Sequence, residues 1–474
     1  MTTTDQPPLA DLPDDPNGIR GKRVLIMGLG LLGGGVAAAR YAAESGAAEV
    51  VVTDLRTEEI LRPSMTRLEG LPLRYVLGQH DVADFQRADI VVRNPGVPRT
   101  SPFLAAAVEA GARVEMEIAW FFRACRGKIA GITGTRGKTT TTALLHHILA
   151  RAGLDTVIGG NLGGVETLSL LPRITPETWV VLELGNFMLE GLHAPRLSPH
   201  LAVFTNLLPD HLNAYASMEE YGEAKSSIFR YQRPGDIAIF NADNVVTRTF
   251  SAEAPTRNTW LFSPSAQRSW RRDDPGTLRA FSFGGDIRLR GAHNLANVQA
   301  ATLAARCLKV PRDVIHEAVA SFAGVPHRLE SVRTLDGVTF INDSASTAPV
   351  ACSAALRSFE APVVLIAGGN SKQLEYDDLA REAVARTRHI VLLKGNATSG
   401  FAEALRRHAT GQGKADPVTG PFDDLAAAVS HARRVAHPGD VVLFSPGFTS
   451  FGMFLNEFDR GDQFRALVQS LPER

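Results

Sequence analysis

The chain has 474 residues, which at roughly 150 residues per domain suggests about three domains. Hydrophobic residues make up 44% and charged residues 21%, a composition typical of globular proteins. The 50 basic and 50 acidic residues cancel, which excludes binding to nucleic acid or to a membrane surface through bulk charge. The three cysteines lie far apart in the sequence. This disfavours a disulfide framework and a thiolate zinc site, and it fits a reducing cytoplasm.

Residues 1–20 are rich in Pro and Asp and predict a disordered tail, because little of this stretch can be buried. The stretch also lacks the apolar core of a signal peptide. The most apolar segment, Val24 to Ala39, contains glycines and stops at Arg40, so it is too short to span a bilayer. We therefore expect a cytoplasmic protein without membrane insertion.

Short β-branched runs alternate with longer Ala- and Leu-rich stretches through the rest of the chain. Continuous apolar strands separated by helices are typical of parallel sheets buried on both faces, so we predict the α/β fold class. The runs lie at residues 24–27, 50–52, 90–92, 129–133, 180–182, 201–204, 338–341, 363–366, 390–393 and 441–444. Breaks near residues 123–127 and 324–328 divide the chain into domains at 21–120, 121–325 and 326–474.

The first glycine loop, Gly28–Gly33, has the pattern G-x-G-x-x-G between a strand and an Ala-rich helix. Its glycines permit a tight turn, and the amides at the start of the helix can bind a diphosphate. Asp54 ends the next strand, where a dinucleotide-binding fold places its ribose-binding acid. The pattern predicts a nucleotide diphosphate site without identifying NAD. The alternative is a turn whose glycines serve only helix–strand packing.

The second glycine loop, Gly134–Thr140, follows a strand and precedes a helix expected from about Ala143. This is a P-loop arrangement, in which backbone amides hold phosphate, Lys138 reaches the β and γ oxygens, and the Thr139 hydroxyl can bind Mg²⁺. It misses the strict pattern because Gly131 lies one position too far upstream. A dehydrogenase needs only the first loop and a kinase only the second. Both together favour an enzyme that uses ATP on a substrate carrying a nucleotide.

The second glycine loop resembles the ATP loop of the Mur ligases of peptidoglycan synthesis. Further motifs follow in the order of that family, which coincidence does not explain. They are Gly160–Gly163, Leu182–Leu184, Thr205-Asn206, Asp210–Leu212, Glu223–Lys225, Asn241–Asp243, Gly291–Asn297, His327–Glu330, Asn342–Ser344, Gly368–Lys372 and Ser445-Pro446. The Rossmann-like first domain and the segment Ser450–Phe454, followed by Arg460-Gly461, are most similar to the branch of the family that adds glutamate.

The resemblance implies a Rossmann-like N-terminal domain, a central P-loop ATPase-type domain and a Rossmann-like C-terminal domain. It implies an ATP-dependent ligase that joins glutamate, D-glutamate before L-glutamate, to UDP-N-acetylmuramoyl-L-alanine in peptidoglycan precursor synthesis. ATP would convert the substrate carboxylate into an acyl phosphate. The amino group of glutamate would then attack, and ADP and phosphate would be released. We expect a monomer with no nucleic-acid partner.

The resemblance also assigns residues to ATP and to two Mg²⁺ ions. Those implied to contact ATP are Gly134, Thr135, Arg136, Gly137, Lys138, Thr139, Thr140, Asn294, Asn297, Arg328 and Asp343. Thr139 and Glu183 would bind one Mg²⁺, and His211 with Lys225 a second. A cationic lysine cannot bind a metal, but carbamylation by CO₂ would give Lys225 an anionic oxygen. Lys138, Glu183, His211 and Lys225 form the implied catalytic set.

The residue types alone permit simpler explanations for several of these positions. Asn294 and Asn297 could be ordinary helix caps, and His211 a structural cap. Lys225 could lie on a solvated helix face, since neither it nor His211 has a standard metal-ligand spacing.

The substrates are assigned by the same resemblance. Leu31, Leu32, Asp54 and Asn94 would contact the uridine diphosphate. Asn161 and His211 would contact the muramoyl-alanine portion. Thr347, Lys372 and Ser450, with Phe451 in the same segment, would bind glutamate. A lysine at the end of a glycine loop is otherwise most often a solvated surface charge.

Several positions depart from the family pattern. Arg136 stands where asparagine is commonest, Ala345 where a lysine often lies, and Glu457 where an aromatic is usual. The usual Ser-Ser-Phe-Gln after the metal-binding glutamate is Gly185–Met188, which loses two hydroxyls and an amide. Four alternatives therefore stay open: an L-glutamate-using ligase, a ligase for another acceptor, an NAD-dependent dehydrogenase, and a nucleotide-binding regulator without catalysis. Retention of the whole catalytic set argues against the last.

Overall fold

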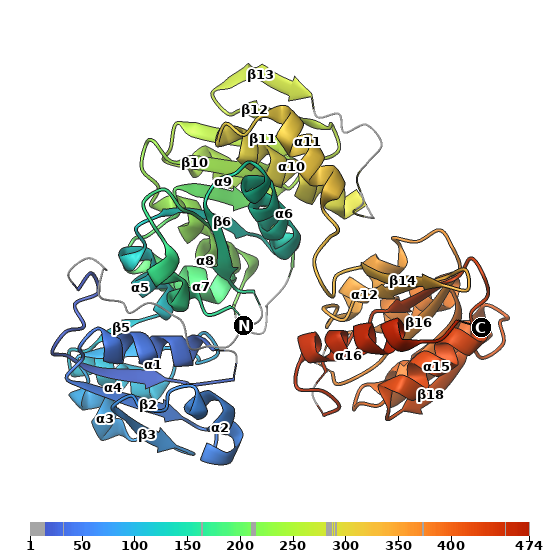
Figure 1. The fold of residues 1–474 in the computed structure, drawn as a ribbon, viewed down its shortest axis with the longest axis horizontal. Helices are drawn as coiled ribbons and strands as arrows, with labels where there is room; N and C mark the ends of the chain where they lie inside the picture. Colours follow the sequence, from blue (N-terminus) through green and yellow to red (C-terminus); the bar gives the residue numbers. More distant parts are fainter. Residues whose placement is uncertain are drawn as a thin grey trace. The chain divides into compact units, whose positions relative to one another are not determined.

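The computed structural model describes residues 15–31, 33–162, 165–209, 215–280, 287, 289, 292–371, 374–450 and 452–473. The chain forms two compact units: unit 1 is Met1–Asp286 with Ala296–Ala320, and unit 2 is Ile287–Leu295 with Ser321–Arg474. Unit 1 contains two sheets and unit 2 contains one (Figure 1). Each sheet consists mainly of parallel strands connected by helices, which confirms the predicted α/β class.

The described residues just before the first strand are held by hydrogen bonds to later helical segments. Residues 1–14 of the predicted tail lie outside the described residues. Asn17 and Ile19 are buried, and the Asn17 amide donates to Tyr41 Oη at 2.9 Å and to the Trp120 carbonyl at 3.1 Å. Across the described part of the chain, no helix has the length and apolar character needed to cross a bilayer.

The first sheet is parallel, in the order β3-β2-β1-β4-β5. Its elements are β1 (Arg23–Met27), α1 (Gly34–Glu44), β2 (Glu49–Asp54), α2 (Glu58–Thr66), β3 (Leu73–Leu77), α3 (Val82–Arg87), β4 (Ile90–Arg93), α4 (Pro102–Glu109), β5 (Arg113–Glu115) and α5 (Glu117–Ala124). Val24 and Ile26 point into one core with α1, whereas Leu25 and Met27 point into the opposite core with residues of α3 and α4. Both faces are therefore buried, as the continuous apolar runs predicted.

The second sheet has the order β13-β12-β11-β10-β9-β6-β8-β7. Its elements are β6 (Lys128–Thr133), α6 (Lys138–Arg151), β7 (Thr156–Gly160), the 3₁₀ helix η2 (Thr167–Arg173), β8 (Trp179–Glu183), α7 (Asn186–His193), β9 (Leu201–Phe204), α8 (Met218–Arg230), β10 (Ile237–Asn241), α9 (Val245–Glu253), β11 (Asn258–Ser263), β12 (Arg268–Arg271), β13 (Asp274–Ala280), α10 (Ala292–Cys307) and α11 (Arg312–Ser321). Strands β6 to β11 are parallel, and β12 and β13 add an antiparallel edge.

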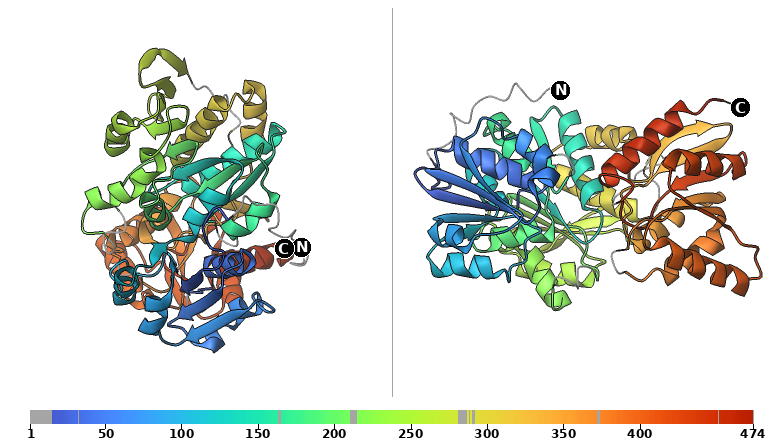
Figure 2. Two further views of the ribbon diagram at one scale, coloured as in Figure 1. Left: turned by 90° about the vertical axis from the view of Figure 1, so that its left-hand side faces the viewer. Right: turned by 90° about the horizontal axis from the view of Figure 1, so that it is seen from below.

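The third sheet, in unit 2, has the order β14-β15-β19-β16-β17-β18, with helices on both faces (Figures 1 and 2). Its elements are β14 (Glu330–Leu335), β15 (Val338–Asn342), α12 (Pro349–Leu356), β16 (Val363–Ala367), α13 (Asp377–Arg386), β17 (Thr387–Leu393), α14 (Thr398–Gly411), β18 (Val418–Phe422), α15 (Leu425–Val435), β19 (Val441–Phe444) and α16 (Glu457–Ser470). Leu365 of β16 packs with α12 to α14, and its neighbour Ile366 packs with α15 and α16. This alternation buries both faces, while the antiparallel β14 forms an edge.

Helix α6 begins at Lys138, five residues before the predicted start. The prediction was late because a run of threonines, Thr139–Thr142, has low helix propensity. Thr141 and Thr142 are fully buried, so tertiary packing stabilises the turn that propensity disfavours. The consequence is functional: Lys138 and Thr139 lie in the first turn of a helix, next to its free amides.

Candidate active site

The second glycine loop joins the carboxyl end of β6 to α6 and depends on two glycines. Gly134 has φ +145° and Gly137 has φ +82°, a backbone region in which side chains are strained. A Cβ at Gly134 would clash with Thr205 Oγ1, and one at Gly137 would clash with Asn297 Oδ1. The loop therefore needs glycine at both positions for conformation and for space.

Hydrogen bonds from the end of β9 hold this loop in place. The Asn206 side chain accepts from Arg136 N at 3.0 Å and donates to Arg136 O at 3.1 Å. Thr205 Oγ1 donates to the same carbonyl at 2.7 Å. The Thr135 amide donates to Asn206 O at 2.9 Å. Polar groups of Thr205-Asn206 thus fix the loop backbone in advance of any ligand.

Lys138 places a cation over the loop. Its Nζ donates to the carbonyls of Gly134 and Thr135, both at 3.1 Å. The half-buried Thr139 follows it in the same helical turn. An anion bound by the loop amides would meet the positive end of α6 and this ammonium together.

Glu183 supplies a buried carboxylate beside the loop. It ends β8, where it lies in register with Ile132 of β6, and it is 3% exposed. Asn161 Nδ2 donates to Glu183 Oε1 at 3.1 Å, whereas Oε2 has no hydrogen-bond partner among the described residues. A buried carboxylate oxygen without a donor is costly unless a cation binds it. This fits the role of a Mg²⁺ ligand that was inferred for Glu183.

Lys225 on α8 is 1% exposed, so the alternative of a solvated helix face is wrong for this residue. Its Nζ donates to Gly134 O at 3.4 Å and lies 4.8 Å from the centre of the Tyr221 ring. Its expected partner His211 lies outside the described residues. Among the described side chains, no group of three or more His, Cys, Asp or Glu residues could hold a metal ion.

The two asparagines inferred to hold adenine lie one turn apart inside α10. Asn297 is 5% exposed, its Oδ1 packs against Gly137, and it accepts from Thr141 Oγ1 at 3.5 Å. Asn294, at 7% exposed, belongs to unit 2. A helix-cap explanation does not fit Asn297, because this residue is interior to the helix and packs on the glycine loop.

The residues inferred to contact uridine diphosphate meet at the carboxyl ends of β1, β2 and β4. Asp54 accepts from Gly30 N at 3.1 Å, and Asn94 Nδ2 donates to Gly28 O at 3.2 Å. Leu31 is 48% exposed at this edge, and Leu32 lies outside the described residues. Asp54 and Asn94 therefore shape the first glycine loop from its two sides.

Two carboxylates crowd the start of α1, directly after that loop. A Cβ at Gly33 would come within 2.7 Å of Glu166 Oε1, and Arg67 forms an ion pair with the same oxygen. A Cβ at Gly34 would come within 3.1 Å of Glu117 Oε2, which has no hydrogen-bond partner among the described residues. Burial raises the pKa of Glu117 to about 7. The positive end of α1 is thus already faced by acidic side chains of the protein.

In unit 2, Asp343 is a buried carboxylate at the end of β15. It is 5% exposed and accepts from Ser346 Oγ at 2.5 Å, Ser445 Oγ at 2.7 Å and Leu329 N at 3.1 Å. Burial raises the pKa of Asp343 to about 6, while these hydrogen bonds and the nearby Arg328 charge act in the opposite direction. The result is a rigidly held carboxylate next to an arginine.

Arg328 is exposed at the centre of a strained turn. His327 has φ +63° and Leu329 has φ +46°, and for residues other than glycine such conformations cost about 1–3 kcal/mol each. The turn is held because His327 N donates to Glu330 Oε2 at 2.8 Å and Leu329 N donates to Asp343. The two left-handed residues and the hydrogen bonds that hold them therefore determine the direction in which Arg328 leaves the turn.

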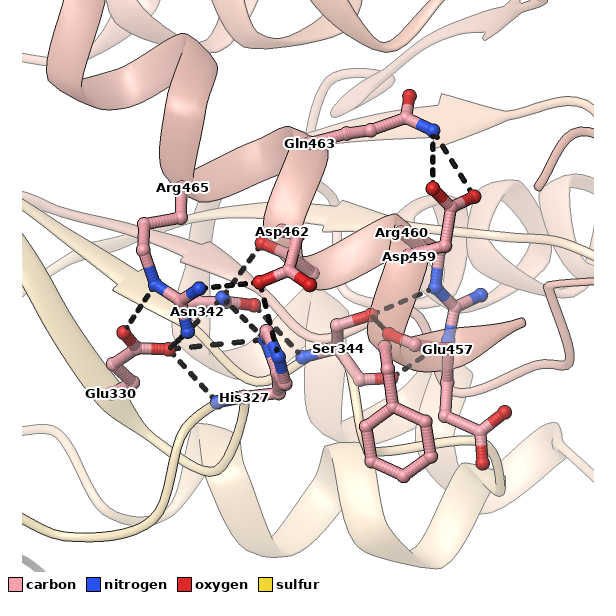
Figure 3. A network of polar contacts seen from close by, with 12 residues as sticks. His327, Glu330, Asn342, Ser344, Glu457, Asp459, Arg460, Asp462, Gln463 and Arg465 are labelled. Atoms are coloured by element: carbon pink, nitrogen blue, oxygen red, sulfur yellow. Dashed lines mark hydrogen bonds and ion pairs between the residues drawn. The ribbon is translucent and has the colours of Figure 1, made fainter. Parts of the chain in front are cut away.

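Figure 3 shows the polar network that supports this turn. Asn342 Nδ2 donates to His327 Nδ1 at 3.0 Å, and the two nitrogens Nε and Nη2 of Arg465 donate to Glu330 at 2.8 and 3.0 Å. A Cβ at Gly461 would overlap the His327 ring. Burial, followed by the Arg465 charge, lowers the pKa of His327, so its neutral ring accepts from Asn342 at neutral pH.

The Arg460-Gly461 motif also has a structural basis. Arg460 is 1% exposed, and burial lowers its pKa to about 10. Its guanidinium donates to Ser344 Oγ at 3.0 Å, Ser344 O at 2.8 Å and Phe448 O at 3.2 Å. It thereby ties α16 to the loop after β15, which contains Asp343 (Figure 3).

The positions inferred to bind glutamate lie on neighbouring loops of unit 2. Thr449, just before the buried Ser450, exchanges backbone hydrogen bonds with Asn370 at 3.0 and 3.1 Å. Thr347 is half-buried in the loop after Asp343. Lys372 and Phe451 lie outside the described residues.

Thr205 and Asn206 form one of the sequence motifs, but no role in the site was predicted for them. The signal was available, since the pair directly follows a strand and ligands of open α/β sheets bind beyond the carboxyl ends of the strands. Asn186 and Tyr215, whose amide and hydroxyl meet at 2.9 Å, had no such local signal.

Three models of Mur ligase domains match the chain. They are the Mur ligase MurD-like, N-terminal domain at residues 22–115, the Mur ligase middle domain at 132–305, and the Mur ligase, glutamate ligase domain at 327–448. The matches follow one another in the order of the three sheets.

Curated relatives span nearly the whole chain. It is 50% identical over 471 residues to a UDP-N-acetylmuramoylalanine–D-glutamate ligase of Roseiflexus sp. (strain RS-1), covering 95% of this chain and 99% of that one. It is 38% identical to an enzyme of the same name from Symbiobacterium thermophilum, covering 95% and 98%. Among solved structures, UDP-N-acetylmuramate-alanine ligase MurC of Thermotoga maritima matches with a TM-score of 0.59 at 20% identity over 95% of this chain and 99% of that chain, which shows a shared fold.

Proposed function

The chain belongs to the Mur ligase family, and on this premise we propose that it joins D-glutamate to UDP-N-acetylmuramoyl-L-alanine while ATP is cleaved to ADP and phosphate. The family inferred from the order of motifs is thus confirmed. The observation that carries the proposal is the glycine loop with Lys138 above it and the unpartnered oxygen of Glu183 in the adjacent strand. This arrangement fits a nucleoside triphosphate and a divalent cation, and two relatives named for this activity match along almost their entire length.

Mur ligases use ATP and Mg²⁺, and the residues present fit both. The loop Gly134–Thr140 would hold the phosphates, Lys138 would neutralise their charge, and Thr139 with Glu183 would bind one Mg²⁺. When bound, Mg²⁺ lowers the repulsion between the phosphates and an approaching carboxylate. Thr205-Asn206 keeps the loop amides oriented, so little reorganisation is needed when the charge shifts.

The chemistry requires concentrated positive charge. A carboxylate acylates poorly until its oxygen is phosphorylated, and that step brings two anions together. The amine of glutamate then forms the C–N bond, the phosphate departs from the same carbon, and the amine loses a proton. Lys138 and the amino end of α6 oppose the charge of the phosphoryl group throughout.

We further propose a second metal site formed by His211 and a carbamylated Lys225. The support is the burial of Lys225 and its position at 3.4 Å from the loop carbonyl of Gly134. A neutral lysine amine adds CO₂ and releases one proton, which gives a carbamate with anionic oxygen. Such an oxygen is a ligand that Mg²⁺ prefers, whereas an ammonium is not.

The remaining assignments are proposals of the same kind. Asn294, Asn297, Asp343 and Arg328 would serve adenine, ribose and phosphates. The uridine diphosphate would contact Leu31, Leu32, Asp54 and Asn94, the muramoyl-alanine portion Asn161 and His211, and glutamate Thr347, Lys372, Ser450 and Phe451. The domain limits 21–120, 121–325 and 326–474, and a monomeric state, complete the proposal.

The first experiment measures phosphate release from ATP with Mg²⁺ and UDP-N-acetylmuramoyl-L-alanine, with D-glutamate and L-glutamate in separate reactions and the product mass checked. We expect turnover with D-glutamate. Turnover with L-glutamate alone would mean that Ala345 and Glu457 belong to a rebuilt pocket, because both depart from the family pattern. Absence of turnover with either would contradict the proposed substrates.

Carbamylation has its own test. Lys225→Ala should lose activity and regain part of it with short-chain carboxylates such as acetate, which can replace the carbamate oxygen. Lys128→Ala, a control on exposed Lys128, should lose nothing and gain nothing. A Lys225→Ala variant that acetate and formate leave inactive would count against the carbamate and leave the ligase proposal standing.

A further inference from the structure

A chain of buried polar side chains runs from the first sheet to the second within unit 1. Arg93, the last residue of β4, donates from Nη2 to Glu190 Oε2 on α7 at 3.1 Å. Tyr215 Oη donates to the other oxygen of Glu190 at 2.5 Å. Asn186, the first residue of α7, donates from Nδ2 to Tyr215 Oη at 2.9 Å. The four side chains form one continuous line, here called the Arg93–Asn186 relay.

Because these polar side chains are buried, their presence points to a role in orientation rather than in stability. The side chains of Arg93 and Glu190 are only 8% and 9% exposed. Removing such a pair from water costs about as much as its attraction returns, so apolar residues would hold the two sheets together equally well. What an ion pair with fixed hydrogen bonds adds is orientation. Both Glu190 oxygens have donors, and the Tyr215 hydroxyl has both a donor and an acceptor.

Each end of the relay reaches a segment assigned to a substrate or a metal. At one end, Arg93 Nη1 donates to Val97 O at 2.7 Å, and the next residue, Asn94, donates to Gly28 O of the first glycine loop. Arg93 therefore holds the far end of the turn that follows β4, and Asn94 holds its near end. At the other end, Asn186 begins α7 three residues after Glu183, which closes β8.

Position 186 is also one of the departures from the family pattern noted in the sequence. A hydroxyl is usual there, and this chain has an amide. The longer Asn186 side chain is 5% exposed and reaches the Tyr215 hydroxyl. Its neighbour Gly185 has no side chain, so Asn186 supplies the side-chain anchor at 185–186. Hydrogen bonds from Leu184 N to Ile132 O and from Thr133 Oγ1 to Leu184 O hold the preceding residue.

We propose that Arg93, Glu190, Tyr215 and Asn186 are positioning residues that hold the Glu183 carboxylate in register with the turn that receives the uridine diphosphate. The inference rests on the proposed function and deepens it: binding of the nucleotide-linked substrate beside Asn94 and orientation of Glu183 become one event. The amide of Asn186 takes over the positioning task of the absent hydroxyls, so the departure at 185–188 does not imply loss of catalysis.

Tyr215→Phe tests the relay with the smallest change. It removes only the hydroxyl and keeps the ring stacked on Phe187, whose centre lies 6.2 Å away. We expect kcat to fall and KM for the UDP-linked substrate to rise, with kcat/KM lower by about 10-fold. Tyr231→Phe is the matched control, because the Tyr231 hydroxyl contacts His193 at the opposite end of the same helix, at 2.8 Å. It should leave all three parameters as they are.

A double-mutant cycle measures whether Arg93 and Asn186, at the two ends of the relay, are energetically coupled in catalysis. Arg93→Met and Asn186→Ala should be non-additive by more than about threefold in kcat/KM. Unfolding midpoints measured on the same proteins separate the alternatives. A network that only stabilises the fold would couple the two variants in the midpoints and leave their kinetic effects additive, which would overturn the inference.

The wild type provides the test of the proposed function on which this rests. If it does not turn over UDP-N-acetylmuramoyl-L-alanine with either glutamate, the proposed function fails. If it does turn over and Tyr215→Phe, folded by circular dichroism, matches wild-type kinetics, only the relay fails.

Discussion

The two glycine loops of unit 1 have the same local structure and opposite surroundings. Each follows a parallel strand and starts a helix after a glycine in the left-handed region, Gly33 at φ +97° and Gly137 at φ +82°, without a side-chain cap. The start of α6 faces Lys138, which lies over its loop. The start of α1 faces the carboxyl groups of Glu166 and Glu117.

This difference shows that the glycine pattern determines backbone shape and the tertiary neighbours determine charge. A helix start attracts anions, and at α6 a cation adds to that attraction. At α1 the neighbouring side chains are carboxyl groups instead: Glu166 is paired with Arg67, and burial raises the pKa of Glu117 to about 7. Membership of the Mur ligase family, rather than the charge at this loop, decides against the dehydrogenase alternative.

The largest expected effect is at the second loop. Lys138→Ala should reduce phosphate release by at least about 100-fold, because it removes the cation that opposes the phosphate charge. Far-ultraviolet circular dichroism and the unfolding midpoint should stay close to wild type. Substantial activity in a folded Lys138→Ala protein would mean that another group supplies that charge.

Gly137→Ala should be next in size. The residue sits at positive φ, which costs about 1–2 kcal/mol with a side chain, and its Cβ would also clash with Asn297. Gly153→Ala is the matched control, since Gly153 has φ +75° and no atom beyond its chain neighbours lies within 4 Å of the place that its Cβ would occupy. ATP affinity measured by calorimetry should fall only for Gly137→Ala. Equal losses in both would assign the effect to backbone strain alone.

Glu166→Gln tests the first loop. It should improve substrate binding, by a smaller factor than the losses expected at the second loop. Removing one negative charge beside Gly33 should lower KM for the UDP-linked substrate by about two- to fivefold at low ionic strength, and by less at high salt. Glu59→Gln, a change to an exposed carboxylate on α2, should not alter KM. A rise in KM for Glu166→Gln would instead identify Glu166 as a substrate contact.

The smallest expected effect is on the pH dependence of the free energy of unfolding, through Glu117. Burial raises the pKa of Glu117 from 4.5 to about 7, so the folded state keeps a proton that the unfolded state releases between these values. Its contribution to stability is therefore fully present below pH 4.5 and is lost as pH rises to about 7. Urea unfolding at pH 5 and pH 8 should show Glu117→Gln gaining stability relative to wild type at the higher pH. Parallel pH profiles would contradict a raised pKa.

Much of the fold was predictable because its signals are local. The apolar runs at residues 24–27, 201–204 and 441–444 became strands β1, β9 and β19, since burial on both faces demands continuous hydrophobic residues. The edge strands β12, β13 and β14 were not predicted. Antiparallel edges have one exposed side, so their sequences are more polar and do not stand out.

The order of the sequence motifs by itself determined the family, the ATP loop and the identity of Glu183 and Lys225 as candidates. Only the tertiary structure decided that Lys225 is buried, that Asn206 holds the loop, and that carboxyl groups cover the start of α1. The physical reason is the distance along the chain over which each determinant acts. A glycine or an apolar run acts on its own few residues, whereas burial and electrostatic sign depend on side chains brought together from distant segments of the chain.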